Sequence, residues 1–372
     1  MYNRALFDTI SAKLGKGKAI ILLGSRQVGK TTLINQILDG RPHLFLDADD
    51  PSTRLALTEP TTAQLRAILG SNDTVFIDEA QRIPKIGITL KLITDQFKNV
   101  QLLVSGSSSF DLTNEIQEPL TGRSWPYELY PISWTEYENK VGYIQAEQDL
   151  VNRMQFGFYP DVLNSTGDEI EVLQNLVNSY LYKDILAFGN IRKPAILEKL
   201  VRALAFQIGN EVSYNELAQL VGVDKNTISN YINLLEKAFV VFRLGSYSGN
   251  LRNEIKRTQK IYFYDTGVRN MVIGNFQPLE LRTDVGALWE NFLMAERLKY
   301  HAYSKNDYTK MYFWRTVSQQ EIDLVEEKDG TLTAFEFKWK AKKTVKTPTA
   351  FKNAYDVDIK IIDRSNFREL LD

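Results

Sequence analysis

A glycine-rich segment, Gly24-Ser-Arg-Gln-Val-Gly29-Lys30-Thr31, constrains the fold of this chain more than any other feature of its sequence. It matches the pattern G-x-x-x-x-G-K-[ST] at every fixed position, between the apolar run Ala19–Leu23 and a stretch with helical spacing at residues 32–38. Glycines let backbone N–H groups turn inward onto phosphates, and the following helix directs its positive end at them. A chance glycine turn is the alternative, and the matching flanks argue against it.

The loop residues have distinct expected roles. Lys30 is expected to reach the β- and γ-phosphates of a nucleotide, and the Thr31 hydroxyl to coordinate magnesium. ATP and Mg²⁺ are therefore the predicted ligands. The residues predicted to contact the nucleotide are Gly24, Ser25, Arg26, Gln27, Val28, Gly29, Lys30, Thr31 and Thr32.

A second motif places an acidic pair, Asp78 and Glu79, at the end of the apolar run at residues 74–77. This is the Walker B arrangement, in which Asp78 binds magnesium directly or through water and Glu79 polarises the attacking water. Alone, the pair could be a solvated helix start. Together with the phosphate loop, it predicts hydrolysis of ATP rather than binding alone.

Two further side chains are candidates for the hydrolytic site. The strand-like run at residues 101–105 leads into serines, and Ser107 or Ser108 is expected to help place the water, as sensor 1 does in AAA+ ATPases. A serine-rich loop with no catalytic role is the alternative. Arg123, in Leu120-Thr-Gly-Arg123, is a candidate contact to the γ-phosphate, and a surface salt bridge is the alternative for this arginine.

The composition excludes several classes of site. The chain has no cysteine, so disulfides, thiolate metal sites and cysteine catalysis are excluded, and His43 and His301 are its only histidines. The chain has no run of 18 or more apolar residues, which a membrane-spanning helix needs. Its start lacks the layout of a signal peptide. We therefore expect a cytoplasmic protein without a membrane partner. The net charge of −1 means that any binding to nucleic acid must come from local basic patches.

Residues 212–244 resemble a winged helix. A helix at residues 213–221 opens with a capping box of Ser213 and Glu216, Gly222 ends it, and Asp224 can cap a second helix. The second helix has polar residues on its leading turns, where such a helix faces base edges in a major groove. These residues are Lys225, Asn226, Ser229 and Asn230.

A basic loop between the strand-like runs at residues 240–244 and 261–264 would form the wing that grips phosphates. Use of the winged helix to bind protein instead of DNA is the alternative, and both stay open. The charged residues of the wing are Arg243, Arg252, Lys256, Arg257 and Lys260, against Glu254.

The carboxyl-terminal part carries a third pattern, in which Asp323 and Glu336 lie on two neighbouring strand-like runs. Lys338 shares a face with Glu336, because strand side chains alternate. If the register brings Asp323 to that face, the two carboxylates could hold a second magnesium ion, with Lys338 and Glu290 nearby. The pattern resembles the PD-(D/E)xK nuclease core. An ordinary cross-strand charge pair is the alternative.

Nearly all of the chain resembles a bacterial and archaeal family that joins an AAA-type P-loop ATPase domain to a winged helix and a nuclease-like domain of unknown function. The resemblance implies ATP binding, hydrolysis and a link to DNA. Phe337 and Trp339 depart from it, because smaller residues are common beside the lysine. The segments that carry it include Arg26-Gln-Val-Gly-Lys-Thr-Thr, Phe76-Ile-Asp-Glu-Ala, Glu128-Leu-Tyr-Pro-Ile-Ser-Trp-Thr-Glu-Tyr and Gly286-Ala-Leu-Trp-Glu-Asn-Phe.

The predicted fold class is α/β: a parallel P-loop NTPase sheet with helices on both faces, then a winged helix and a small α/β restriction-endonuclease-like domain. The predicted division is an ATPase domain at residues 1–150, a helical lid or linker at 151–205, a winged helix at 206–265 and a nuclease-like domain at 266–372. The main functional hypothesis is an ATPase that couples its nucleotide state to the winged helix and the nuclease-like domain and acts on DNA. The alternative is a signalling or scaffolding ATPase with protein-binding modules and an inactive nuclease fold, and a homo-oligomer is left open in both.

Overall fold

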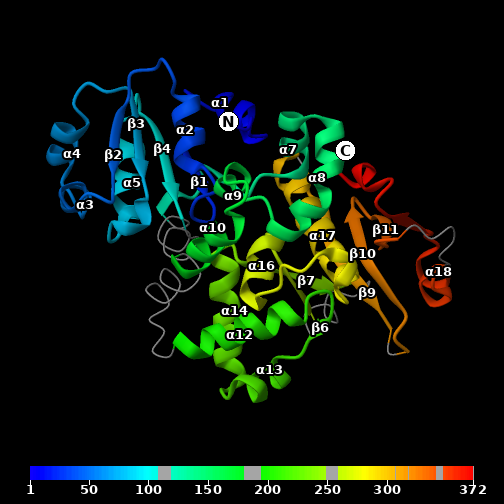
Figure 1. The fold of residues 1–372 in the computed structure, drawn as a ribbon. Coiled ribbons are helices and arrows are strands. Elements are labelled where there is room, and N and C mark those ends of the chain that lie inside the picture. Colours follow the sequence, from blue (N-terminus) through cyan, green and yellow to red (C-terminus); the bar gives the residue numbers. More distant parts are fainter. Residues whose placement is uncertain are drawn as a thin grey trace. The chain divides into compact units, whose positions relative to one another are not determined.

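The structure is a computed structural model, and it describes residues 1–107, 119–179, 194–248, 259–305, 307–316, 318–340 and 347–371 (Figure 1). The chain divides into two compact units, Met1–Ile132 with Lys237–Phe239, and Ser133–Glu236 with Val240–Asp372. Each unit is described by itself below. The predicted helix at residues 169–186 is described as far as α10 (Glu169–Leu176), and residues 180–193 lie outside the described part.

The first unit is built on a parallel sheet with the strand order β2-β3-β4-β1-β5, as the alternation of strands and helices predicts. Its central strand β1 is buried along its whole length, which explains its uninterrupted apolar sequence. The sequence analysis missed β5, whose Pro126 is tolerated because the strand lies at the edge of the sheet. The strands are β1 (Ala19–Leu23), β2 (Leu44–Asp47), β3 (Thr74–Asp78), β4 (Gln101–Gly106) and β5 (Ser124–Glu128).

Helices connect these strands. The helix α2 begins at the lysine of the phosphate loop, and α4 begins with a capping box of Thr61 and Gln64. The helices act as the crossover connections that parallel strands need. Because β1, β3 and β4 run in the same direction, their carboxyl ends meet at one edge of the sheet. The helices are α1 (Leu6–Ser11), α2 (Lys30–Ile37), α3 (Pro51–Leu57), α4 (Thr62–Leu69) and α5 (Ile86–Gln96).

The second unit contains a mixed sheet of seven strands in the order β12-β11-β10-β9-β7-β8-β6. The strands are β6 (Glu211–Val212), β7 (Val241–Ser246), β8 (Gln259–Phe263), β9 (Lys310–Arg315), β10 (Glu321–Lys328), β11 (Thr331–Phe337) and β12 (Ile359–Ile362). Its helices are α7 (Trp134–Val141), α8 (Tyr143–Phe156), α9 (Pro160–Asn164), α10, α12 (Pro194–Phe206), α13 (Tyr214–Val221), α14 (Lys225–Lys237), α16 (Thr266–Ile273), α17 (Val285–Tyr303) and α18 (Thr349–Tyr355).

This continuous sheet corrects the expected fold class, in which a winged helix precedes a separate small domain. The predicted hairpin of β7 and β8 forms, but β7 also pairs in parallel with β9 through Gly245 and Ser246. The free edge of β7 offers unpaired backbone groups, and β9 satisfies them. The two expected parts therefore share one sheet. The boundaries of the four-domain division stay a prediction.

The helix-turn-helix pair forms as the sequence predicts. The Ser213 hydroxyl caps α13 by accepting a hydrogen bond from the Glu216 backbone N–H at 3.4 Å. Gly222 ends the helix in the left-handed conformation, with φ of 81°. The Asp224 carboxylate then accepts from the Thr227 N–H at 3.0 Å and caps α14.

An aromatic cluster lies in the core of the second unit, around the fully buried ring of Trp134. The Trp134 ring packs edge-on against Phe292 and Phe367, with centroids 6.0 and 5.2 Å apart. Its backbone N–H donates to the buried carboxylate of Glu296 at 2.6 Å. The motif segment around Trp134 thus serves packing within this unit.

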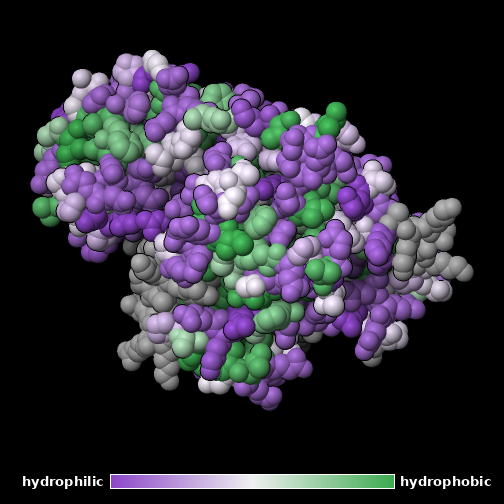
Figure 2. All heavy atoms as spheres, viewed as in Figure 1, coloured by the Kyte–Doolittle hydropathy of each residue, from purple (hydrophilic) through white to green (hydrophobic). Residues whose placement is uncertain are grey.

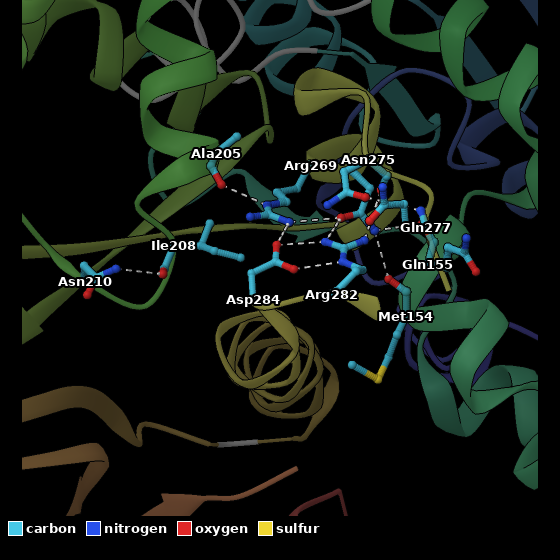
Figure 3. Close-up of polar contacts among 11 residues, drawn as sticks. Met154, Gln155, Ala205, Ile208, Asn210, Arg269, Asn275, Gln277, Arg282 and Asp284 are labelled. Atoms are coloured by element: carbon cyan, nitrogen blue, oxygen red, sulfur yellow. Dashed lines mark hydrogen bonds and ion pairs between the residues drawn. The ribbon is translucent and has the colours of Figure 1, made fainter. Parts of the chain in front are cut away.

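A network of two buried arginines and one half-buried carboxylate joins α16 to the start of α17 (Figure 3). Arg269 and Arg282 both donate to Asp284, at 2.6 and 2.8 Å. Arg269 also donates to the Ala205 carbonyl of α12 at 2.8 Å, and Arg282 donates to Asn270 at 2.9 Å. Burial alone would raise the pKa of Asp284, but the hydrogen bonds from Arg282 and Arg269 outweigh it and lower the pKa to about 2.

In the part of the chain that the structure describes, no helix is long and apolar enough to cross a bilayer. Figure 2 shows a face that is mainly hydrophilic, with smaller hydrophobic areas between.

Replacing Asp284 by alanine is expected to lower the free energy of unfolding by about 3–5 kcal/mol, because two buried guanidinium groups lose their counter-ion. The folded pKa lies below the ordinary value of 3.8, so the contribution is complete above about pH 4 and is lost as the pH falls toward 2. Urea denaturation followed by near-ultraviolet circular dichroism measures both effects. Glu171→Ala, which removes an exposed carboxylate, is the control. Equal stability of the two variants would contradict the prediction.

Candidate functional site

The predicted phosphate loop follows β1 and leads into α2, and Lys30 is buried at its end. The Lys30 Nζ donates to the backbone carbonyls of Gly24 at 3.1 Å and Ser25 at 2.9 Å. Burial lowers the pKa of Lys30, against the opposing effect of the Glu79 and Asp78 carboxylates. The ammonium thus lies against the loop.

The two glycines of the loop are needed for different reasons. A Cβ atom on Gly24 would lie 2.1 Å from the Leu129 carbonyl oxygen, so only glycine fits there. Gly29 adopts the left-handed conformation at the start of α2, with φ of 92°.

Arg4 supports the loop from outside, and the sequence analysis missed it. Its guanidinium donates to the Val28 carbonyl at 2.7 Å and to the Tyr130 carbonyl at 2.6 Å. No local pattern in the sequence marks such a contact across 126 residues.

The Walker B aspartate meets the loop directly. The Thr31 hydroxyl donates to Asp78 Oδ2 at 2.8 Å, so the two expected magnesium ligands are in contact. Asp78 is buried at the end of β3, and the Ser105 hydroxyl of β4 donates to its other oxygen.

Glu79 and Ser107 are joined by a residue that the sequence analysis did not identify, Gln81. The Gln81 side-chain amide donates to Glu79 Oε2 at 2.5 Å and to the Ser107 hydroxyl at 2.8 Å. The Ser107 backbone N–H donates back to the side-chain Oε1 of Gln81 at 3.2 Å. Glu79 itself has a left-handed backbone with φ of 51°, which is uncommon for a residue with a side chain. Ser108, the alternative sensor residue, lies outside the described part.

Arg123 does not lie with these residues. Its carbonyl accepts from the Ala19 N–H at 2.9 Å, beside the start of β1, whereas the loop follows the end of that strand. Five strand residues separate the two edges by roughly 16 Å. The Arg123 guanidinium donates to Asp95 at 2.7 Å, which is the salt bridge considered as the alternative. Within one chain, Arg123 therefore lies away from the phosphate loop.

A cavity of about 830 Å³ lies between α1 and α2, next to the loop. Thr32, the last residue of the predicted nucleotide set, lines it together with residues of α1. The other lining residues are Met1, Asn3, Arg4, Phe7, Asp8, Asn35, Gln36 and Asp39.

The expected recognition helix is only partly exposed. Lys225, Asn226 and Asn230 are exposed, Ser229 is half-buried, and the apolar side chains between them face inward. Arg243, expected in the wing, forms an ion pair with Glu236 of α14. Arg252, Glu254, Lys256 and Arg257 lie outside the described residues.

In the carboxyl-terminal sheet, β10 and β11 pair antiparallel, as predicted. The pairing of Leu324 with Phe335 sets Asp323 opposite Glu336, so the two carboxylates share a face. The Asp323 carboxylate accepts from the Phe337 N–H at 2.7 Å, and Lys338 Nζ lies 2.5 Å from Glu336.

Glu290 of α17 and Glu321 of β10 extend this group, and we call Glu290, Glu321, Asp323 and Glu336 the acidic cluster. Burial raises the pKa of Glu290 to about 7, with a further contribution from Asp323. Burial and the neighbouring Glu336 raise the pKa of Asp323 to about 6.

Lys260 enters the acidic cluster from β8, and the sequence analysis had placed it in the wing. Its side chain is fully buried, and its Nζ forms ion pairs with Glu290, at 3.0 Å, and with Glu321. Burial alone would lower the pKa of Lys260, but the surrounding carboxylates outweigh it and raise the pKa. Among the described residues, no group of three or more acidic or histidine side chains is placed to hold a metal ion. The second magnesium site stays a prediction.

Comparison with known proteins places an AAA domain at residues 16–138. Residues 147–279 and 285–366 match two domains of unknown function, DUF8612 and DUF4143. The chain is 29% identical over 329 residues to an uncharacterised protein of Mycobacterium tuberculosis, covering 87% of this chain and 71% of that protein. It is 23% identical over 310 residues to one of Methanocaldococcus jannaschii, covering 77% and 68%.

Among solved structures, a Walker-type ATPase of Pyrococcus abyssi superposes with a TM-score of 0.52. The match covers 73% of this chain and 96% of that one at 15% identity, so it shows likeness of fold alone. The chain therefore contains an AAA-family P-loop domain, followed by parts whose functions are unknown.

Replacing Gln81 by alanine is expected to lower kcat for ATP hydrolysis by on the order of tenfold to a hundredfold, because Glu79 and Ser107 lose their common partner. The Kd for ATP should stay unchanged, since Gln81 does not touch the phosphate loop. Gln96→Ala makes the same chemical change at an exposed position of this unit and should alter neither value. A Gln81→Ala protein with unchanged kcat would exclude the positioning role.

Proposed function

We propose that this chain is a Mg²⁺-dependent ATPase that couples its nucleotide state to the helix pair α13 and α14, acting on DNA. The observation that carries the proposal is the meeting of Lys30, Thr31 and Asp78 at one edge of a parallel sheet. Ligands bind at this edge in sheets of this kind.

The oxygen donors at this edge suit magnesium. Thr31 and Asp78 offer a hydroxyl and a carboxylate oxygen that lie 2.8 Å apart, and hard divalent cations prefer oxygen ligands. The ion, when bound, neutralises charge on the β- and γ-phosphate oxygens. Thr31 and Asp78 would hold it, in place of the hydrogen bond between them.

Side chains of the chain would contact the phosphates, activate the water and position the catalytic carboxylate. Lys30 exchanges the carbonyl oxygens of Gly24 and Ser25 for phosphate oxygens, and its ammonium balances their charge. Glu79 orients the attacking water and accepts its proton. Gln81 holds the Glu79 carboxylate in a fixed direction relative to Ser107.

The cavity beside Thr32 is suited to the nucleoside part of ATP. The loop holds the phosphates, so the base has to lie within one nucleotide's length of Lys30, and Thr32, which follows the loop on α2, lines the cavity. Phe7 offers an apolar ring, and Asn3 and Asn35 offer amide groups for hydrogen bonds to the base.

The support for DNA comes from the leading turn of α14. The exposed Lys225, Asn226 and Asn230 occupy the end of the second helix that faces base edges in helix-turn-helix proteins.

A second candidate is the signalling or scaffolding ATPase, whose downstream parts bind protein and whose nuclease fold is inactive. The internal ion pairs of Arg243 and Lys260 favour it, because they withdraw two basic side chains from the expected wing. Measuring ATP hydrolysis with and without duplex DNA at low salt separates the two candidates. Stimulation by DNA supports the first, and its absence supports the second.

At the nucleotide site, Lys30→Ala is expected to abolish ATP binding, because the charge that faces the phosphates is lost. Glu79→Gln should keep ATP binding and lower kcat by on the order of a hundredfold or more, since an amide cannot accept the proton. Equilibrium binding of a fluorescent ATP analogue and phosphate release measure the two steps. Full hydrolysis by Glu79→Gln would exclude Glu79 as the base.

On α14, the double change of Lys225 and Asn226 to alanine is expected to weaken DNA binding and to flatten its salt dependence, because a positive charge is removed from the helix end that faces the DNA. Fluorescence anisotropy with a labelled duplex over a range of salt concentrations measures both. Lys91→Ala removes an exposed lysine from α5 and serves as the control. If the parent protein binds no duplex at low salt, the DNA hypothesis is wrong.

A further inference from the structure

We infer that the Lys260 ammonium is the resident cation of the acidic cluster and takes the place that a divalent ion would otherwise occupy. This goes beyond the proposed ATPase function, because it concerns the carboxyl-terminal sheet alone. It also decides what chemistry that sheet can perform.

The position of Lys260 is that of a bound cation rather than of a surface lysine. Its side chain is fully buried, and its Nζ lies 3.0 Å from Glu290 Oε1 and pairs with Glu321. The centroid of the Phe313 ring lies 5.4 Å from Lys260 Nζ, so the ring covers another side of the ammonium. A buried ammonium is costly unless carboxylates surround it, so this arrangement is stable only with the acidic cluster in place.

Further donors of the protein contact carboxylate oxygens of the acidic cluster. The Tyr262 hydroxyl donates to Glu290 Oε1, the oxygen that Lys260 also contacts, at 2.6 Å, and the Phe337 N–H donates to Asp323 Oδ2 at 2.7 Å. Lys338 lies against Glu336. A magnesium ion needs oxygens freed from such bonds and arranged around it at about 2.1 Å.

The charge of the site agrees with this geometry. Lys260 and Lys338 bring two positive charges into the acidic cluster, and Arg315 adds a third at 3.4 Å from Glu321. The pKa of Glu290, raised to about 7 mainly by burial, further reduces the negative charge near neutral pH. A divalent ion would therefore have to displace the ammonium of a fully buried side chain whose backbone is part of β8.

The acidic cluster thus forms a buried ion-pair network that holds three elements together, rather than a metal centre. It joins β8 of the hairpin to α17 through Glu290 and to β10 through Glu321. The sheet then lacks the metal ion on which phosphodiester cleavage of the nuclease type depends.

Manganese binding tests the inference, measured by the electron paramagnetic resonance signal of free Mn²⁺ on nucleotide-free, full-length protein. Asp78→Asn is present throughout, so that the ATP site contributes nothing. This protein is expected to show no saturable Mn²⁺ binding. Adding Lys260→Met should create one saturable site and lower the melting temperature, and Mn²⁺ should then restore part of that loss.

Two controls separate the charge of Lys260 from its bulk and from general charge effects. Lys260→Arg keeps the cation and should gain no Mn²⁺ site, and Lys310→Met removes an exposed lysine from β9 and should change neither property. The inference is overturned if the Asp78→Asn protein binds Mn²⁺ saturably and loses that binding on Asp323→Asn. This arm decides the question even if Lys260→Met fails to fold.

Discussion

Parallel pairing of β1, β3 and β4 is the constraint on which the nucleotide site depends. It brings the ends of three strands to one edge, so that a lysine, an acidic pair and serines from separate segments become neighbours. The Thr31–Asp78 hydrogen bond shows the effect of this pairing directly, because it joins two residues that are 47 positions apart in the sequence. A strand out of register by one residue would turn Asp78 away from the loop.

In the second unit, buried ion pairs determine which elements meet, as parallel strand pairing does in the first unit. Asp284 between two arginines and Lys260 between carboxylates each depend on partners from other elements. Such pairs add little net stability compared with apolar packing, but each is costly to break. They therefore specify which elements meet, more than they strengthen the fold.

The sequence predicted what local patterns encode. The phosphate loop, the Walker B strand, the helix pair and the β10–β11 hairpin each rest on a pattern within one short continuous segment, and all are present. Pairing of β7 with β9 was not predicted, because no local signal marks a contact between distant strands. Lys260 was assigned to a solvated wing, since its neighbours in the sequence are polar, whereas tertiary contacts bury it. Gln81 and Arg4 lie in no periodic pattern.

The single seven-stranded sheet has a consequence for how this chain can be divided. A cut near residue 265 would separate β7 from β9 and leave two unpaired strand edges, each able to associate with other chains. The same cut would part Lys260 from Glu290 and Glu321 and leave charges stranded in apolar surroundings. The hairpin and the carboxyl-terminal strands therefore form one structural unit. Removing either one would leave the other with an exposed strand edge and unpaired charges.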